Sequence, residues 1–390
     1  MAITSATTRA QGTGTSVRFV HTSDWQLGMM RRFLGPEAGA RYSQARVDAI
    51  ERIAAVAAEH DAAFVVVAGD VFDSNQVDRQ VVLRACEALR SISCPVYVLP
   101  GNHDSLEPGT VWASPTLTKH LPSHVDVLVD SEPRHPTPQV EVVGVPWRTR
   151  RPHTDPLEAL ESLDEVAQGD VRVLVGHGQV DSLAPDVGGP ALIRLDAVER
   201  AVRDRRVHYV ALGDRHSCTS VGETGRIWYS GTPEPTRPEE ERPGEVLVVD
   251  LEPGGGCTVR PVHVGTWRLL SHVVDVDGDA DLEELASWLG EQPDKSRTVV
   301  RLGVRGTLSV AGLTRLEMLL EAHEEMYAAI QRWQRNWAVG VSPEEADFDE
   351  LPVTGPARAA LEELRIASGS GDTQAADALA LLHRLAGGGA

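Results

Sequence analysis

Five short segments of the sequence each place metal-binding side chains directly after an apolar run of strand type. The segments are Ser23-Asp24-Trp25-Gln26, Gly69-Asp70-Val71-Phe72-Asp73, Gly101-Asn102-His103-Asp104, Gly176-His177-Gly178 and Gly213-Asp214-Arg215-His216. Carboxylate, imidazole and amide groups suit manganese, iron or zinc. Two such ions held roughly 3.5–4 Å apart can activate water against a phosphate ester. The five segments in this order therefore predict a metal-dependent hydrolase with two divalent ions.

The order of the segments also suggests a role for each side chain. Asp70 lies in the middle of the set, and we expect it to bridge the two ions. His103 directly follows a ligand and is expected to stay off the metals, where it orients the substrate phosphate or protonates the leaving oxygen. The other ligands divide between the ions. Asp24 would hold the first ion and Asn102 and His177 the second, while Asp214 and His216, two apart on an extended segment, would serve one ion each.

Each segment taken alone has a purely structural interpretation. Gly-Asp pairs suit turns, Asn102 suits a helix N-cap, the glycines around His177 suit a tight turn, and the charges of residues 214–216 suit a surface loop. Five independent turns would seldom all present ligand residues after strand-like runs, so the metal site is the favoured interpretation. Supporting roles as caps, turn residues or partners of the ligands are expected for Asp73, Asp104 and Asp181, and His21 sits near the site.

Apolar runs and helical periodicity predict the elements that position these residues. Strands are expected at 17–20, 64–68 and 96–99, with helices at 40–60 and 79–91 between them. Further strands follow near 125–129, 140–145, 171–175, 208–212 and 227–230, and a terminal hairpin spans 245–251 and 258–264. The pattern predicts an α/β fold of two packed mixed β-sheets flanked by helices, with the ligands in loops at strand ends.

The pattern changes after residue 268. A strand at 271–276, a helix at 280–290, a strand at 298–304 and a helix at 309–326 predict a small α+β domain over residues 269–354. Gly355-Pro356 marks the start of a C-terminal helical segment, residues 355–390, with helices at 357–367 and 373–385. Residues 1–16 are expected to be disordered, and residues 17–268 to form the hydrolase domain.

Composition narrows the class of partner and the compartment. The 390 residues carry a formal net charge of −20, which argues against strong autonomous binding to DNA, because nucleic-acid binders usually have a basic surface. Bound metals and a partner subunit would offset that charge. One local exception is the cluster Arg148, Arg150 and Arg151 after Trp147, for which a solvated loop is favoured over a phosphate-contact loop.

The same composition gives no sign of a membrane protein. No run approaches about 20 apolar residues, the N-terminus lacks the apolar region of a signal peptide, and the four cysteines have no CxxC spacing. A cytoplasmic protein with reduced thiols and no membrane partner is expected.

With these residues in place, residues 17–238 resemble the calcineurin-like metallophosphoesterases and, within them, the SbcD-type DNA repair exonuclease subunits. The resemblance rests on the motifs at residues 21–25, 69–73, 99–104, 211–213 and 229–235, of which the first and last are more diagnostic of the nuclease subgroup. It implies that the 269–354 segment is a capping domain and that the C-terminal helices contact the coiled-coil base of an SbcC-type ATPase. It also implies a homodimer.

Two ligand positions depart from the family pattern. Gln26 stands where the family has the His of its Asp-x-His motif, and Asp214 stands at the first His of Gly-His-x-His. Asp214 is a conservative ligand exchange that adds a negative charge and favours harder ions such as manganese. Gln26 offers a neutral, weaker ligand, so the first metal would bind less tightly. Because Asp70 and His103 are retained, an active enzyme with altered metal preference is favoured over a silent one.

The expected function is therefore a manganese-dependent DNA exonuclease or endonuclease subunit that works in DNA repair with an SbcC-type ATPase. Iron and zinc are the alternative metals. Two other functions stay open: a phosphodiesterase or phosphatase for a small molecule, which the acidic net charge favours somewhat, and a non-catalytic scaffold that binds DNA ends or the ATPase.

Overall fold

The computed structural model describes residues 16–184, 191–253, 255–341 and 353–370, together with residues 372, 374–375, 378–379 and 381–382. The disorder predicted for residues 1–16 falls, apart from Ser16, outside the described residues. The chain forms two compact units, Met1–Arg32 with Gly39–Trp267 and Phe33–Ala38 with Arg268–Ala390. Among the helices of the described part, none has the length and apolarity needed to cross a membrane.

The first sheet of the first unit is built around the N-terminal strand. Its order is β12 (Cys257–His263), β11 (Glu245–Leu251), β1 (Val17–Thr22), β2 (Val65–Val67), β3 (Val96–Val98) and β4 (Val125–Val127). Strands β1 to β4 run parallel to one another, whereas β11 is antiparallel to both of its neighbours. The carboxyl ends of β1, β2 and β3 therefore meet at one edge.

The second sheet is also mixed. Its order is β5 (Arg134–Thr137), β6 (Val140–Gly144), β7 (Val171–His177), β8 (Tyr209–Gly213), β10 (Ile227–Tyr229) and β9 (Thr219–Val221). The four central strands are parallel and the two outer strands antiparallel. The outer strands β5 and β9 are short and polar, and the sequence pattern did not predict them.

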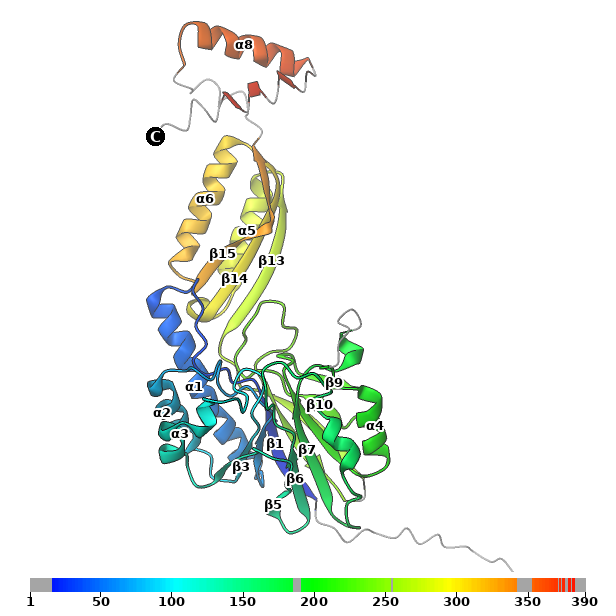
Figure 1. Ribbon diagram of the computed structural model, residues 1–390. Helices are drawn as coiled ribbons and strands as arrows, with labels where there is room; N and C mark the ends of the chain where they lie inside the picture. The colour runs from blue at the N-terminus through cyan, green and yellow to red at the C-terminus, as the bar shows by residue number, and fades with distance from the viewer. Residues whose placement is uncertain are drawn as a thin grey trace, which may run out of the picture. The chain divides into compact units, whose positions relative to one another are not determined.

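Helices cover the outer faces of the two sheets (Figure 1). Helices α1 (Pro36–Glu59), α2 (Arg79–Leu89) and α3 (Pro115–His120) lie over the first sheet, and α4 (Leu195–Arg203) lies over the second. Three short 3-10 helices, Val111–Ala113, Glu158–Ser162 and Asp181–Leu183, sit in the loops. The layers confirm the predicted α/β fold with two packed mixed sheets flanked by helices.

The core between the sheets follows from strand alternation. In β1, Val17 and Phe19 face the second sheet, whereas Val20 faces the helices. Phe19 stacks on Phe64 with ring centroids 4.8 Å apart and meets the edge of Tyr209 from β8 at 5.4 Å. These aromatic contacts join the two sheets near the amino ends of β2 and β8.

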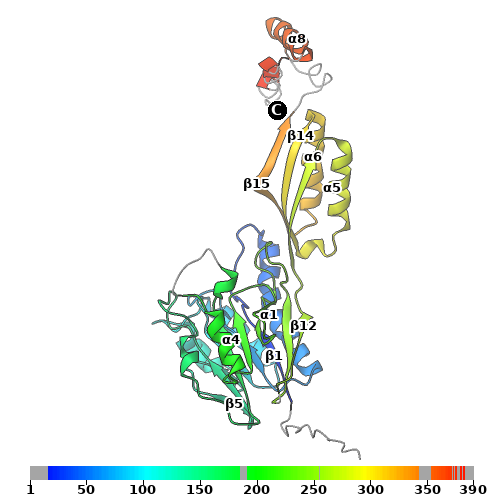
Figure 2. The ribbon, with the colours of Figure 1, turned by 90° about the vertical axis from the view of Figure 1, so that its right-hand side faces the viewer.

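The second unit contains a three-stranded parallel sheet of β13 (Arg268–Val276), β14 (Thr298–Leu308) and β15 (Ala329–Val341). Helices α5 (Asp279–Glu291) and α6 (Val310–Glu324) connect the strands and lie on one face of the sheet, as Figure 2 shows. Strand β15 was not predicted, because its polar residues 331–332 and 334–336 interrupt the apolar pattern.

The C-terminal segment is helical where it is described. Helix α8 (Pro356–Gly369) confirms the helix predicted at 357–367. The helix predicted at 373–385 lies largely outside the described residues, and those of its residues that are described are helical.

Phe19→Ala should remove the aromatic link between the two sheets. Truncation of a fully buried phenylalanine costs about 3–5 kcal/mol because it leaves a cavity, and Phe19 is 0% exposed. Urea denaturation followed by circular dichroism would measure the loss. Met30→Ala is the control, because Met30 is 81% exposed, and it should change stability by less than about 0.5 kcal/mol. Equal effects of the two substitutions would contradict this account of the core.

Candidate metal centre

The predicted ligands converge at the carboxyl edges of the two sheets. Asp24 and Asp70 follow β1 and β2, His177 ends β7, and Asp214 follows β8. Asp24, Asp70 and His177 are buried, and one ligand atom from each lies within 4.8 Å of the other two. Segments that are far apart in sequence thus form one cluster, because parallel strands deliver their ends to the same edge.

Strained backbone conformations aim the carboxylates inward. Asp24, Gln26, Asp70 and Asp214 all have positive φ, at 54°, 51°, 54° and 97°, a region that residues other than glycine seldom occupy. The first two loops hold each other in place, since the Asp24 amide donates to the Gly69 carbonyl at 3.0 Å and the Gln26 amide to the Asp70 carbonyl at 2.9 Å. Such strain is typical of functional sites.

Two glycines make room for the ligands. A Cβ on Gly69 would lie 2.2 Å from Nδ1 of His177, and a Cβ on Gly101 would lie 2.3 Å from Oδ1 of Asp70. Both distances are far shorter than van der Waals contact, so no larger residue fits at either position. The glycine that opens each of these motifs is therefore required by close approach of a ligand.

One half of the cluster surrounds the imidazole of His177. Its Nδ1 donates to the carbonyl of Ala68 at 2.8 Å, which turns Nε2 toward oxygen atoms. Nε2 lies 2.8 Å from Oδ1 of Asn102, 3.5 Å from Oδ1 of Asp70 and 3.8 Å from Oδ1 of Asp214. An imidazole nitrogen and three oxygens of this kind form a set that can hold a divalent ion.

The other half is centred on Asp24 and His216. Nδ1 of His216 lies 3.0 Å from Oε1 of Glu240, and Nε2 lies 3.8 Å from Oδ1 of Asp24. A carboxylate that accepts the Nδ1 proton fixes the ring and leaves Nε2 free to bind a metal. The carboxylate of Asp24 also accepts hydrogen bonds from Ser23 Oγ at 2.6 Å and from the Asp214 amide at 3.1 Å.

The hydrogen bonds of the Gln26 amide group indicate whether this half of the cluster suits a cation. Its Nε2 donates to Oδ2 of Asp70 at 3.1 Å. Its Oε1 is buried and has no hydrogen-bond partner among the described residues. A buried amide oxygen without a partner costs free energy unless it meets a donor or a cation. Oε1 therefore has the chemistry of a ligand, and the departure from imidazole at this position leaves a usable oxygen on a side chain that contacts Asp70.

His103 lies beside Asp70 on the solvent side. Its amide donates to Oδ1 of Asp70 at 2.9 Å, and its Nε2 lies 4.0 Å from Oδ2 of the same carboxylate. Nδ1 donates to the Asp73 carbonyl at 2.8 Å. The side chain is 34% exposed, so Nε2 is accessible to a substrate in front of Asp70.

The charges of the cluster perturb one another. Burial by itself would lower the pKa of His177, but the carboxylates of Asp70, Asp24 and Asp214 outweigh burial and raise the pKa well above 6.5. Burial raises the pKa of both Asp24 and Asp214. For Asp70, burial is opposed by the charge and hydrogen bond of His177 and by His103, and the pKa is lowered. The surrounding carboxylates therefore favour the protonated form of the His177 ring.

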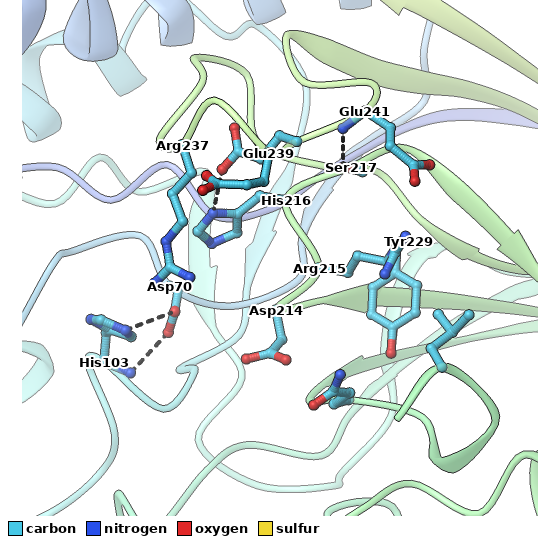
Figure 3. Close-up of a pocket in the computed structure, with 13 residues that line it drawn as sticks. Asp70, His103, Asp214, Arg215, His216, Ser217, Tyr229, Arg237, Glu239 and Glu241 are labelled. Atoms are coloured by element: carbon cyan, nitrogen blue, oxygen red, sulfur yellow. Dashed lines mark hydrogen bonds and ion pairs between the residues drawn. The ribbon is translucent and has the colours of Figure 1, made fainter. Parts of the chain in front are cut away.

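A pocket of about 420 Å³ opens over the cluster. Figure 3 shows Asp70 and His103 facing each other, with Asp214 and His216 beside the same space. The rest of its lining is strongly charged and includes Arg215, Arg237, Glu239, Glu240 and Glu241. The pocket gives a substrate access to Asp70, Asp214 and His216 among the predicted ligands, and to His103.

Two residues at the site, Glu240 and Trp147, had roles that the sequence did not assign. Glu240 orients His216, and Trp147 donates from Nε1 to the carbonyl of His177 at 2.6 Å. Asp104 has a supporting role of the kind expected: it is buried and accepts from the amides of Phe72 and Gly101 at 3.1 and 2.7 Å. Burial and the charge of Asp70 raise its pKa to about 7.

The other supporting residues serve as the sequence suggested. Asp181 accepts from the Leu195 amide at 3.3 Å, and Asp73 contributes its carbonyl to His103. His21 is buried behind the ligand loops, where its Nε2 lies 3.2 Å from the Leu212 carbonyl. No single-residue signal in the sequence distinguishes Glu240 from the acidic residues beside it.

The family profile of the calcineurin-like phosphoesterases matches residues 17–218, just over half of the chain. The chain belongs to this family. It is therefore a metal-dependent phosphoesterase of a family that uses two metal ions, and the cluster of Asp24, Asp70 and His177 provides a metal site for that chemistry.

The solved structures that are similar to the chain include three proteins of low sequence identity. The protein TT1561 of Thermus thermophilus is 12% identical, with 64% of this chain and 100% of that chain covered and a TM-score of 0.39. A dimetal phosphatase from Danio rerio is 12% identical, with 64% and 99% covered and a TM-score of 0.38. A 5′-nucleotidase precursor from Thermus thermophilus is 14% identical, with 64% and 54% covered and a TM-score of 0.35. No curated protein sequence matches the chain.

Metal binding should release protons. The raised pKa of His177 keeps its ring protonated above pH 6.5 in the metal-free protein, and a divalent ion must displace that proton. Affinity should therefore rise as pH rises toward the raised pKa. Calorimetric titration with Mn²⁺ at pH 7, in two buffers of different ionisation enthalpy, should report release of about one proton or more. Metal binding to the His177→Asn variant should release about one proton fewer. Binding heats that do not depend on the buffer would contradict the raised pKa of His177.

Gln26 should contribute to the affinity for one ion. Gln26→Met keeps the side-chain volume but removes the amide oxygen. We expect this substitution to lower the affinity for one of the two ions by about tenfold or more. Gln26→His should hold both ions. Elemental analysis after dialysis against graded Mn²⁺ would measure the stoichiometry. Equal uptake by wild type and Gln26→Met would show that Oε1 is not a ligand.

Proposed function

We propose that this protein is a metal-dependent phosphodiesterase that cleaves DNA, as an SbcD-type exonuclease or endonuclease subunit in DNA repair. Manganese is the proposed metal, because the site is rich in carboxylate and amide oxygens and Asp214 stands at a position of imidazole in the family pattern. The observation that carries the proposal is the single cluster formed by the predicted ligands, with His103 accessible beside it.

The proposed ligand set follows the two halves of the cluster. Asp24, Gln26 and His216 would hold the first ion, Asn102, His177 and Asp214 the second, and Asp70 would bridge them. When bound, the two ions supply an activated water and neutralise the phosphate charge. His216 is held by Glu240, and Trp147 ties the backbone of His177 to the neighbouring loop, so the protein presents these ligands in fixed orientations.

His103 is proposed to act on the substrate directly. Because its Nδ1 donates to the Asp73 carbonyl, its Nε2 is the atom turned toward the pocket. In the cationic ring this nitrogen carries a proton, which it can donate to the phosphate or to the leaving oxygen. Its backbone amide binds Asp70, so its position depends on the bridging carboxylate.

The motifs at residues 21–25 and 229–235, which are the more diagnostic of the nuclease subgroup, contact each other in the structure. These contacts support the DNA assignment. Ser23 Oγ lies 2.8 Å from Ser230 Oγ, and Thr232 Oγ1 donates to the Asp24 carbonyl at 2.8 Å. Glu234, fully buried, accepts hydrogen bonds from Thr266 and from the Trp267 amide. These two motifs therefore form one structural feature, which joins the first metal loop to the end of the first unit.

The remaining parts of the proposal concern partners and location. An SbcC-type ATPase is the proposed partner of the C-terminal helical segment, because α8 exposes Ile366, which is 71% exposed. A capping role for residues 269–354, a homodimer and a cytoplasmic location complete the proposal. An acidic chain of net charge −20 fits a nuclease that relies on a partner for much of its affinity for DNA.

A small-molecule phosphodiesterase or phosphatase is the second candidate. It is favoured by the acidic residues Glu239, Glu240 and Glu241 in the lining of the pocket. Like charges there would repel a polyanion more than a single phosphate ester. A non-catalytic scaffold is the third candidate, and it predicts little metal in the purified protein.

Asp70→Ala should abolish hydrolysis, since one carboxylate contacts both halves of the proposed site. The assay is degradation of end-labelled linear DNA in Mn²⁺, Mg²⁺ and Zn²⁺, with and without the ATPase subunit, and with bis(p-nitrophenyl) phosphate as a small ester. We expect DNA cleavage to fall by about 10³-fold or more.

The matched control is Asp130→Ala, an exposed carboxylate near Arg134 whose loss should leave both activities unchanged. DNA cleavage that survives in Asp70→Ala would refute the assignment. Turnover of the small ester without any cleavage of DNA would favour the second candidate.

A further inference from the structure

The loop after β6 lies directly beside the candidate metal centre. The Trp147 amide donates to the Pro100 carbonyl at 3.2 Å, and its carbonyl accepts from the Leu106 amide at 2.9 Å. These bonds attach the loop to the segment that carries Asn102 and His103. The Trp147 ring also meets the His177 ring edge-on, with centroids 6.1 Å apart. Residues that follow Trp147 are therefore held next to the second half of the site.

The loop concentrates positive charge in an acidic protein. Arg148, Arg150 and Arg151 are all exposed, whereas the chain as a whole carries a net charge of −20. The Arg150 amide donates to Glu107 Oε1, and the Arg151 amide donates to Thr149 Oγ1. The backbone of the loop is therefore anchored locally. The guanidinium of Arg148 donates only a long hydrogen bond within the described part of the chain, to the Val129 carbonyl at 3.4 Å.

A second pocket, of about 300 Å³, lies in this loop. Its lining includes Trp147, Arg148, His153, Pro146 and Pro156, so an aromatic ring, a cation and apolar walls share one space. The lining also has two acidic residues, Asp155 and Glu158. Asp155 already accepts from the Leu157 amide and pairs with Arg194. The cation of Arg148 is therefore not cancelled by that carboxylate.

We propose that this pocket binds the nucleotide next to the scissile phosphate of a single nucleic-acid strand. A base fits against Trp147 and the prolines, because every base offers a flat face to an aromatic ring. Arg148 and Arg150 bind the flanking phosphates. The inference rests on the proposed function and adds the substrate class of one subsite: a nucleotide rather than a simple phosphate ester.

The test compares two charge-matched double variants of the full-length protein. One is Arg148→Gln with Arg150→Gln. The control is Arg79→Gln with Arg84→Gln, two exposed arginines of α2 that line neither pocket. Both variants and wild type are assayed in Mn²⁺ on a single-stranded oligonucleotide and on bis(p-nitrophenyl) phosphate, which has no nucleoside to bind.

The loop variant should raise KM for the oligonucleotide by about tenfold or more, and the salt dependence of log KM should become shallower by about 1.4, or 0.7 per lost phosphate contact. Its turnover of the small ester should stay within about twofold of wild type, as should both activities of the control. The preserved small-ester activity also shows that the variant is folded and holds its metals.

Three outcomes would overturn the inference. The loop variant could cleave the oligonucleotide like the control, or it could lose both activities in parallel. In either case wild-type cleavage of DNA would leave the proposed function standing. A wild type that hydrolyses the small ester but, with or without the ATPase subunit, neither binds nor cleaves the oligonucleotide would overturn the proposed function and this subsite together.

Discussion

Repulsion between clustered carboxylates, two of them fully buried, is the constraint on which the rest of this structure depends. Asp24, Asp70 and Asp214 meet around one imidazole at the edges of two sheets. Buried charges of like sign are costly unless an opposite charge lies among them. The αL loops, the close glycines and the amides that donate to Asp24 and Asp70 all hold these groups together against that repulsion. The architecture is therefore organised for a cation that the His177 proton can only partly replace.

The two departures from the family pattern both change the ligand chemistry of the site, from nitrogen toward oxygen donors. Asp214 adds a negative charge where an imidazole would be neutral, and Gln26 replaces another imidazole by an amide oxygen. Both substitutions exchange nitrogen for oxygen, which shifts the preference toward harder ions. The unpartnered Oε1 of Gln26 indicates that the exchange keeps a donor in the site. Both departures therefore keep an oxygen donor at the position where the family pattern has an imidazole.

The extent to which the sequence predicted this arrangement depended on periodicity. Asp24, Asp70, His177 and Asp214 could be assigned to one site because each follows an apolar strand, and parallel strands share an edge. Glu240 could not be assigned to the site from the sequence, because its contact with His216 depends on how a loop without a periodic pattern folds back. The same limit applies to elements. The strands β5, β9 and β15 are rich in polar residues, and their pairing partners rather than their own composition make them strands.

The central position of β1 has a consequence for biosynthesis. This strand pairs with β2 on one side and with β11 on the other, and the ion pair between Arg18 and Asp250 joins residues 232 positions apart. At a translation rate of about 5–20 residues per second, β1 emerges roughly 10–50 seconds before its partner β11. Until then one edge of β1 is exposed, and the loop that carries Asp24 lacks its contacts with residues 214–240. The nascent chain should therefore depend on chaperones that cover strand edges, and metal loading should follow completion of the first unit.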